Sequence, residues 1–537
     1  MRYVILIIYF FSFSSVAFAD YTVKSEYLKN PEKNIDLVVQ TAEFWKNARD
    51  DEHGGFYIYV DENGNPTYPA EDWWFTEECG TLFDYHLKTV FGQSRLAYAY
   101  SKAFMVTGNL EYLNYAQHAL DFMYEHGWDD ENDGWFFTFD EEGTIAPWLP
   151  CDAWDPNDWK WSFNQLYALL GIAAIAEANM DASTTGYHWW TAGSDNWDWL
   201  LYGVNMLDDR LWDSREDYLG YYENTDLDWS NPQGKSFTGA ADSITTHALS
   251  LYLMTGKPRF KTRLLALADN IVDHLVPTIA LPETAFGFVE YFDNDWDIDD
   301  SRHDGFVGHL MKAAWCLARA YLISPREEYR EGAMTIINEV WNNGGYDHIY
   351  GGIYQDLDWS TGEITQGKNF WNVEQGFTGG ISNYYIAENQ ADRDLNLKMA
   401  DESIDFFMNN FVDWEKGGTF TETLNDGTPA DTSKGQIWKA GYHDSEFGYL
   451  GYLYGSLYYK KESVSLYYHF TPKKYAHRIK LTPIAIENDA IVISKVKLNG
   501  QPFRHFNRKK RTLRIPPGVG GVFKVTFSPK LHKPCQK

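Results

Sequence analysis

Three histidines, His247, His309 and His443, occupy comparable places along the sequence and could carry proton-transfer chemistry. His309 follows Gly308 and begins an apolar stretch that continues to Ile323 with helical spacing. A helix N-terminus carries a partial positive charge, which disfavours imidazolium and leaves a neutral histidine ready to accept a proton. The pattern therefore predicts general acid–base catalysis centred on these three residues.

The elements that would position the histidines repeat about six times. An acidic cluster, one or two glycines and alternating aromatic residues together predict a short hairpin. The pattern occurs at 50–64, 129–143, 212–222, 287–293, 351–356 and 417–422. Between these hairpins, an apolar helix, a tight turn and a more polar helix follow one another. Six helix pairs predict an (α/α)6 toroid or barrel, mainly α, with the hairpins and loops building a cleft at one end.

The repeating pattern stops near residue 460, and short β-prone runs follow. These runs lie at 478–481, 490–498, 512–515 and 522–527. Turns at 499–500 and 516–518 separate them, which predicts a small C-terminal β-sheet domain. The predicted organisation is a leader at 1–19, a toroid at 20–462 and a basic β domain at 463–537.

The first residues have the features of a secretory signal peptide. Arg2 precedes an apolar run, and Ala17-Phe18-Ala19 forms an A-x-A cleavage site before Asp20. Cleavage after Ala19 would give an exported protein, periplasmic or secreted, and no later segment is long and apolar enough to span a membrane. The four cysteines lack metal-site spacing, so no metal site is expected.

The net charge of −30 is unevenly distributed. Residues 464–537 contain 16 Lys and Arg but 2 acidic residues, so this segment carries +14 and the rest carries −44. The basic segment could dock on the acidic toroid, which we favour slightly, or it could meet an anionic polymer or a membrane surface. Nucleic acid is not an expected partner of an exported protein.

Several motifs resemble those of the N-acylglucosamine 2-epimerase superfamily, whose members include cellobiose 2-epimerase and mannose isomerase. The motifs are Gln93–Ser101, Thr246–Gly256, Gly308–Trp315, Asn369–Glu374 and Trp438–His443. The resemblance extends from about Glu43 to Tyr459 and leaves the C-terminal segment unexplained. It implies an (α/α)6 sugar epimerase or isomerase that needs no cofactor and acts on a carbohydrate.

The resemblance also implies roles for individual residues. His309 and His443 would exchange the proton at C2 of the sugar, and His247 would assist ring opening. The substrate-binding residues would be Arg95, Trp371, Glu374, Trp315 and Glu446. The chemistry suits these types, because a proton next to a carbonyl is weakly acidic and its removal needs a cation near the enediolate.

Three positions depart from the family pattern. Ser250 and Lys312 stand where the family usually has glutamate, three residues after a histidine, and Glu446 stands where it commonly has arginine. We expect Lys312 to lower the pKa of His309 and Glu446 to raise that of His443. His309 would then be the better base and His443 the better resting acid.

Other functions remain open from the sequence. A polysaccharide lyase could use the same histidines and arginine, with an anionic oligo- or polysaccharide as substrate. A glycoside hydrolase would need two cleft carboxylates, for which the candidates are Glu374, Glu446, Asp152 and Asp155. A non-catalytic polysaccharide-binding relative is the third alternative. The acidic hairpins are expected to be solvated loops.

Overall fold

The protein is described by a computed structural model that covers residues 20–69, 85–148, 155–179, 195–483, 485–487 and 490–530. The predicted signal peptide, Asp152, and three of the four cysteines lie outside these residues. Cys316 is buried, as expected for a small apolar residue of a helix. Among the described residues, none of the helices has the length and hydropathy needed to cross a bilayer.

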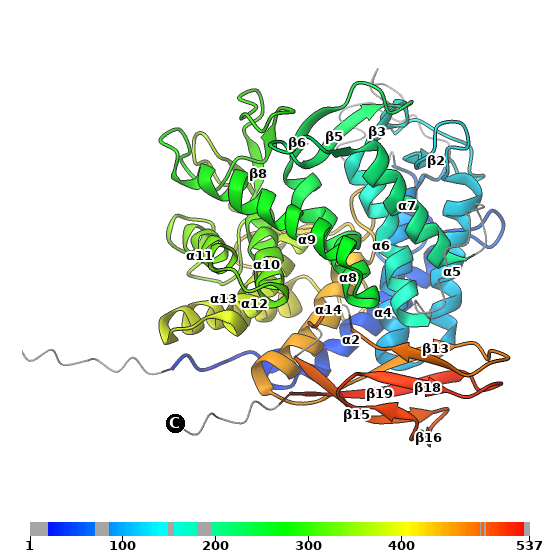
Figure 1. The fold of residues 1–537 in the computed structure, drawn as a ribbon. Coiled ribbons are helices and arrows are strands. Elements are labelled where there is room, and N and C mark those ends of the chain that lie inside the picture. Colours follow the sequence, from blue (N-terminus) through cyan, green and yellow to red (C-terminus); the bar gives the residue numbers. More distant parts are fainter. Residues whose placement is uncertain are drawn as a thin grey trace, which may run out of the picture.

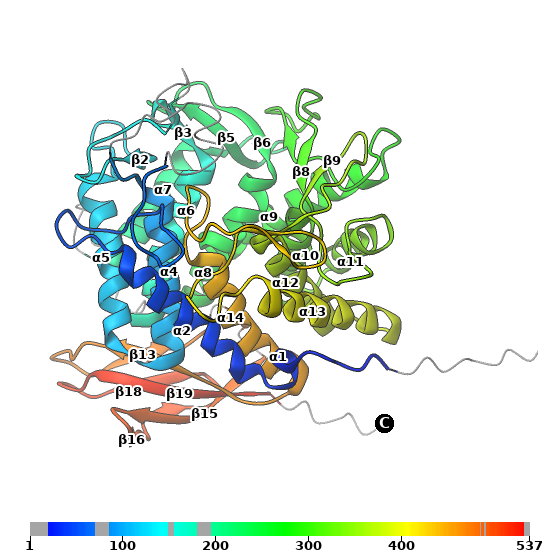
Figure 2. The same ribbon diagram turned by 180° about the vertical axis from the view of Figure 1, so that it is seen from behind.

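Helix pairs form a closed double ring (Figures 1 and 2). The inner helices are α4 (Val90–Thr107), α6 (Ser162–Asn179), α8 (Leu249–Thr255), α10 (Val307–Ile323), α12 (Phe370–Ile386) and α14 (Tyr442–Tyr454). The outer helices are α2 (Asn34–Trp45), α5 (Leu110–His126), α7 (Asn196–Arg210), α9 (Pro258–Asn270), α11 (Glu327–Asn342) and α13 (Gln390–Asn410). The ring closes because α14 packs against both α12 and α4. The predicted (α/α)6 toroid is confirmed.

The sequence explains which helices are inner and which are outer. Nearly every residue of α6 is buried, in keeping with its almost wholly apolar sequence, whereas α9 buries one stripe and exposes a basic face. Caps define the helix ends: Thr89 accepts a hydrogen bond from the Gly92 amide, and Gly108 ends α4 with φ 78°. Two π-helical segments, Thr238–Asp242 and Ile244–Ala248, precede α8.

Short strands and hairpins cover the N-terminal ends of the inner helices. They are β1 (Lys88–Thr89), β2 (Thr138–Phe139), β3 (Trp159–Trp161), β4 (Trp212–Asp213), β5 (Gly220–Asp226), β6 (Gln233–Ser236), β7 (Tyr291–Phe292), β8 (Asp304–Phe306), β9 (Asp356–Asp358), β10 (Lys368–Asn369), β11 (Glu422–Thr423) and β12 (Pro429–Asp431). Pairing is antiparallel throughout, in the orders β1-β2, β3-β5-β6-β7 with β4 on β5, β8-β9, and β10-β11-β12. All lie at one rim of the ring (Figure 1).

Buried Lys–Asp ion pairs hold five of the six hairpins to the segments that lead into the inner helices. They are Lys88–Asp50, Lys160–Asp129, Lys235–Asp213, Lys368–Asp347 and Lys434–Asp413, with Nζ–carboxylate distances of 2.7–2.8 Å. Each aspartate also accepts backbone N–H groups of its own turn. The expectation that the acidic hairpins are solvated loops is therefore wrong for Asp50, Asp129 and Asp213, which are buried.

The fourth predicted hairpin, at 287–293, differs from the other five. Its residues are all described, and none of them forms a Lys–Asp pair of this kind. Gly305 stands two residues before α10, in the place that Lys88 and Lys368 occupy before α4 and α12. Instead, the hairpin supplies Glu290, which contacts a histidine of α10.

Two small antiparallel sheets follow the toroid, as predicted. The last helical turn ends at Lys460, and the first sheet is β13 (Val464–Phe470), β19 (Gly521–Pro529), β15 (Ile491–Leu498) and β16 (Gln501–Pro502). The second sheet is β14 (His477–Lys480), β18 (Thr512–Ile515) and β17 (Phe506–Asn507). They lie at the end of the ring opposite the hairpins (Figure 1), and β13 packs on α4 and α6. The predicted division at 462/463 stays a prediction.

Candidate active site

His309 lies in the first turn of α10 at the hairpin end of the toroid. Its Nδ1 is 2.7 Å from Oε2 of Glu290, and its ring stacks on Phe237 with centroids 4.0 Å apart. Gly308 allows this position, because a Cβ there would meet the side chain of Asn372 at 2.0 Å. With Nδ1–H donated to Glu290, Nε2 is the nitrogen available to a substrate.

His443 lies in the first turn of α14 and has a similar arrangement. Its Nδ1 is 3.2 Å from Oε2 of Glu374 on α12. Burial lowers the pKa of His443 well below the ordinary histidine value, and the positive charges of Arg95 and Lys312 add to the effect. The resting imidazole is therefore neutral, and the expectation that His443 is the better resting acid is wrong.

The indole of Trp371 joins the two histidines. Its ring centroid is 5.1 Å from that of His309 and 6.0 Å from that of His443. Trp371 stands at the start of α12 and is partly exposed, whereas its neighbour Phe370 is buried. The two imidazoles and the indole therefore line one site, in which an apolar sugar face could rest on the indole.

Arg95 lies on α4 with its charge directed into the same region. Its guanidinium is 4.6 Å from the Tyr167 ring centroid, and its Nη1 donates to the Trp438 carbonyl oxygen at 2.5 Å. Its buried Nε has no hydrogen-bond partner among the described residues. A buried guanidinium with an unused N–H donor, close enough to affect His443, is suited to hold an oxyanion.

Lys312 has an acidic partner on another inner helix, and its predicted effect on His309 stays a prediction. It forms a buried ion pair with Asp242 and is 3.1 Å from the Tyr167 hydroxyl. Burial opposes its charge, but the Asp242 carboxylate outweighs that effect and raises the pKa of Lys312. The carboxylate support that seemed lost from His309 comes instead from Glu290.

Glu374 and Glu446 form a buried carboxyl pair behind His443. Oε1 of Glu374 and Oε2 of Glu446 have no hydrogen-bond partner among the described residues. Burial raises the pKa of both carboxyl groups, and the charge of Glu446 raises that of Glu374 further, while Lys312 opposes both shifts. Two adjacent buried carboxyls favour sharing one proton over carrying two charges. Glu374, rather than Glu446, is the support of His443.

The same three side chains have the spacing of a metal site. Candidate ligand atoms of Glu374, His443 and Glu446 lie within 4.8 Å of one another. The positive charge of Lys312 lowers the pKa of all three side chains, and it would repel a metal ion bound between them. A proton shared by the two carboxyl groups accounts for the arrangement without adding a divalent cation. The absence of a metal from the reaction stays a prediction.

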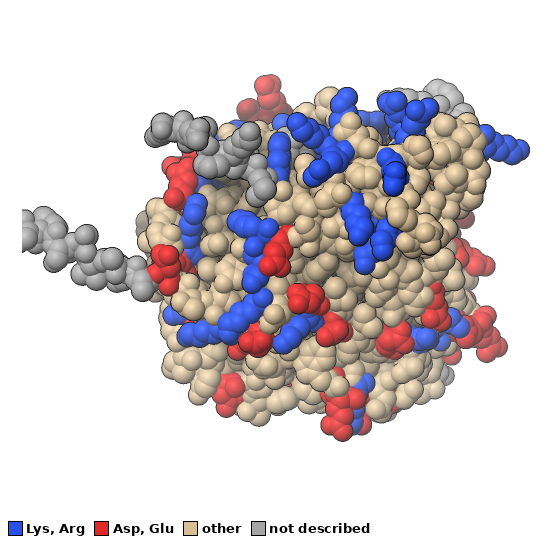
Figure 3. All heavy atoms as spheres, turned by 90° about the horizontal axis from the view of Figure 1, so that it is seen from below, with Lys and Arg blue, Asp and Glu red and all other residues tan. Residues whose placement is uncertain are grey.

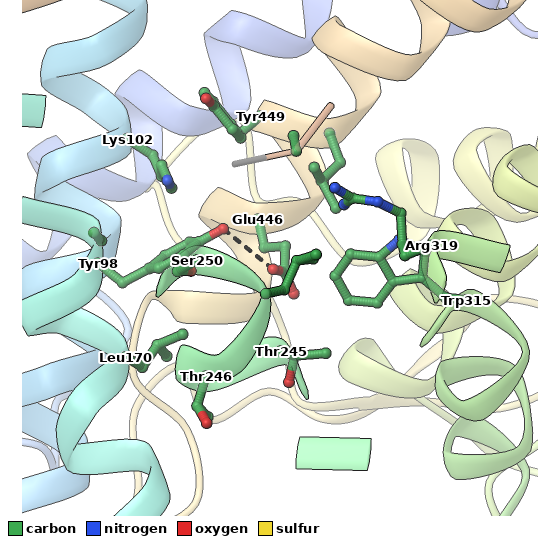
Figure 4. A pocket seen from close by; sticks show the side chains of 14 residues that line it. Tyr98, Lys102, Leu170, Thr245, Thr246, Ser250, Trp315, Arg319, Glu446 and Tyr449 are labelled. Atoms are coloured by element: carbon green, nitrogen blue, oxygen red, sulfur yellow. Dashed lines mark hydrogen bonds between the residues drawn. The ribbon is translucent and has the colours of Figure 1, made fainter. Parts of the chain in front are cut away.

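A small cavity lies behind Glu446 on the toroid axis (Figure 4). It has a volume of about 40 Å³, and its lining includes Glu446, Tyr98, Lys102, Trp315 and Arg319. Tyr98 donates to Glu446 at 3.1 Å. The volume has room for a few water molecules, not for a sugar.

Two residues predicted for the site are not brought to it. Trp315 is buried in the lining of this cavity (Figure 4), and its Nε1 donates to the Tyr454 hydroxyl at 3.3 Å. His247 is buried near Tyr221 and Arg263, away from the other two histidines. Burial, with a smaller effect of Arg263, lowers the pKa of His247 to about 3. Its predicted role in ring opening has no support from the geometry.

Sequence reasoning missed an aromatic wall beside Arg95. The partly buried rings Trp148, Trp161, Phe163 and Trp438 pack against one another and against Phe91 and Phe137. Trp161 also donates from Nε1 to Glu223 at 3.2 Å. Glu223 and Glu290 each stand three residues after a hairpin glycine, Gly220 and Gly287 respectively. This common spacing is the feature of the sequence that could have identified the two glutamates as site residues.

Comparisons with known proteins agree with this architecture. A family model described as N-acylglucosamine 2-epimerase matches residues 71–444. A cellobiose 2-epimerase of Eubacterium cellulosolvens is 22% identical over 437 residues, covering 78% of this chain and 96% of that protein. The solved cellobiose 2-epimerase of Bacillus thermoamylovorans has a TM-score of 0.62 at 17% identity, covering 79% and 99% of the two chains. A D-mannose isomerase has a TM-score of 0.61 at 16% identity, covering 80% and 100%.

Proposed function

This chain belongs to the N-acylglucosamine 2-epimerase family and is a sugar epimerase or isomerase, and we propose that it moves the C2 proton of a reducing sugar between His443 and His309. One observation carries the proposal. Both imidazoles line the same Trp371 ring, and each has its Nδ1 fixed by a buried carboxylate so that Nε2 is available.

In the proposed reaction, His443 is the base. When the shared carboxyl proton is on Glu446, Glu374 is ionised and accepts Nδ1–H, which leaves the Nε2 lone pair free. Nε2 takes the C2 proton of the open-chain sugar. The electron pair of the broken C–H bond forms the C1–C2 double bond, and the π pair of the C1 carbonyl moves to O1 to give the enediolate. Arg95 stabilises that oxyanion.

His309 completes the reaction as the acid. In its protonated form it gives the Nε2 proton to the other face of C2 in an epimerisation, or to C1 in an aldose–ketose isomerisation, and proton exchange with water then restores both histidines. The Glu290 carboxylate keeps the His309 ring in place and supplies the opposite charge while the ring is protonated. No step requires a cofactor.

We propose a reducing monosaccharide or oligosaccharide as substrate, as the names of the relatives suggest. One sugar would rest on Trp371, and the wall that contains Trp161 and Trp438 could stack a second. The proposed signal peptide would place the reaction outside the cytoplasm, in the periplasm or medium. There an oligosaccharide, including an anionic one, is a more available substrate than a sugar phosphate.

The alternative of a glycoside hydrolase has less support. The two catalytic carboxylates of a hydrolase flank the scissile bond about 5–10 Å apart. In this protein, a carboxylate oxygen of Glu374 lies within 4.8 Å of one of Glu446, and both side chains are buried. Asp155 caps a turn by accepting the Asn157 amide. A polysaccharide lyase remains the second candidate, because His443 and Arg95 could also act on a uronate.

Proton exchange tests the proposal. The protein is incubated in D₂O with mannose, cellobiose and uronate-containing oligosaccharides, and products are followed by NMR, with and without EDTA. Deuterium should appear at C2 of a reducing sugar and should be lost in His309→Ala and His443→Ala. The exposed His348→Ala is the matched control and should retain exchange. Unsaturated or shortened products without C2 exchange would instead identify a lyase or a hydrolase.

A further inference from the structure

The segment that forms the two C-terminal sheets carries a positive charge that few acidic residues of its own offset. Residues 464–530 contain 14 Lys and Arg but two acidic residues, Glu487 and Asp489. Glu487 is buried against Arg319 of α10 and the Tyr458 hydroxyl. In this ion pair the acid belongs to the C-terminal segment and the base to the toroid, which is the reverse of basic strands docking on an acidic toroid.

Most of the basic side chains have no acidic partner. Ten of them make no ion pair with any described residue: Lys474, Lys495, Lys497, Arg504, Arg508, Lys509, Lys510, Arg514, Lys524 and Lys530. We call these ten residues the basic surface. Eight of the ten are exposed, and Lys497 and Lys524 are partly exposed. Electrostatic docking, which the sequence slightly favoured, therefore does not account for these ten residues, and for the rest of the segment it stays a prediction.

The strand register places like charges directly opposite one another. Lys497 of β15 pairs with Lys524 of β19, and Arg478 of β14 pairs with Arg514 of β18. Directly opposite residues of a sheet are close neighbours, and like charges there are unfavourable. Arg478 has a further interaction of its own, but the Lys497–Lys524 pair gains from an external anion that lies along the strands.

The basic surface lies at the end of the molecule opposite the hairpins. Viewed from below, Lys and Arg side chains gather over the half of the face that appears at the top of Figure 3. Figure 1 shows the C-terminal strands under the ring and the hairpins above it. An anion bound there would not enter the histidine site.

We propose that the basic surface binds an anionic polysaccharide, with carboxylate or sulfate groups, and anchors the enzyme to it. The carbohydrate class rests on the proposed function, since a sugar epimerase gains from staying near polymers that release its substrate. The acidic toroid restricts such a polymer to this end. Membrane binding is less favoured, because Tyr475 is the one large hydrophobic side chain that is strongly exposed among the described residues of these sheets.

Binding measurements on the full mature chain test the proposal. Polygalacturonate and chondroitin sulfate are titrated at 20 and 300 mM NaCl, with neutral mannan as the control polymer. The triple variant Arg508→Gln/Lys510→Gln/Arg514→Gln removes three exposed charges of the basic surface. Its matched control is Lys24→Gln/Arg259→Gln/Lys416→Gln, which removes three exposed charges from the toroid.

The expected result is salt-sensitive binding to the anionic polymers that becomes about tenfold weaker in the first variant and is unchanged in the control. Both variants should retain C2 exchange on a neutral sugar. In the absence of polymer, the first variant should be at least as stable as the parent, because it relieves one like-charge pair.

Four results would overturn the proposal: no binding to either anionic polymer, equal weakening in both variants, tighter binding to phosphatidylserine vesicles or to single-stranded DNA, or salt-sensitive self-association in sedimentation. Polymer binding without C2 exchange on any sugar would instead reject the proposed function and leave the polyanion site in place.

Discussion

Replacing Glu290 by glutamine tests whether the carboxylate beside His309 serves the reaction. The side chain keeps its shape, but the charge 2.7 Å from Nδ1 is lost. A hydrogen bond to a charged group contributes roughly 1.5–3 kcal/mol, which corresponds to a fall in kcat of roughly 10- to 150-fold. The His309 side chain is 19% exposed, so solvent screening favours the lower half of that range. Steady-state kinetics with the substrate found by NMR measure kcat and KM.

Glu223→Gln is the control for this change. Glu223 has the same register in the preceding hairpin, but its partners are Ser236 and the Trp161 indole rather than a histidine. We expect Glu223→Gln to act mainly on KM, through the aromatic wall, and Glu290→Gln mainly on kcat. Equal kcat losses in both variants, or an unchanged kcat in Glu290→Gln, would refute the role given to Glu290.

Three further predictions follow from buried groups. His247→Gln should retain C2 exchange. In the parent protein, the native pKa of His247 is about 3, below its value in the unfolded chain, so the free energy of unfolding falls as pH falls below 6.5. In urea titrations, His247→Gln should therefore lose less free energy of unfolding between pH 7 and pH 4.5 than the parent protein does. Lys160→Met should cost about 3–5 kcal/mol by leaving Asp129 buried without its cation, and adding Asp129→Asn should restore much of this in chemical denaturation. Trp371→Ala should lower kcat/KM strongly, because this indole lies beside His309. Trp315→Phe should lower the thermal midpoint of unfolding and leave KM unchanged, because Trp315 is buried. The reverse pattern would contradict the positions assigned to the two indoles.

Local patterns in the sequence predicted the fold well. Helical spacing of apolar residues gave the inner helices, and glycine with alternating aromatics gave the rim hairpins. Both signals depend on which residues within one element are buried, so they can be recognised without knowledge of the other elements. The alternation in 490–498 and 522–527 likewise predicted β15 and β19.

The partners of the site residues were not predictable in the same way. Glu290 reaches His309 from another hairpin, and Asp242 reaches Lys312 from another inner helix, so both contacts depend on packing between repeats. The π-helical turns before α8 change which side chains face inward, because each wide turn shifts the following residues around the axis. Asp242 therefore lies in the interior, whereas His247 faces Tyr221 and Arg263.

The missing Lys–Asp pair of the fourth hairpin has a consequence for motion at the rim. Five hairpins are each joined to an inner helix by a buried ion pair, so opening one of them strands two charges in the interior. The 287–293 segment has no Lys–Asp pair of this kind, and the buried charge that it carries, Glu290, contacts His309 instead. We expect the amide protons of this segment to exchange with solvent faster than those of the other five, and we expect a sugar to enter and leave beside it.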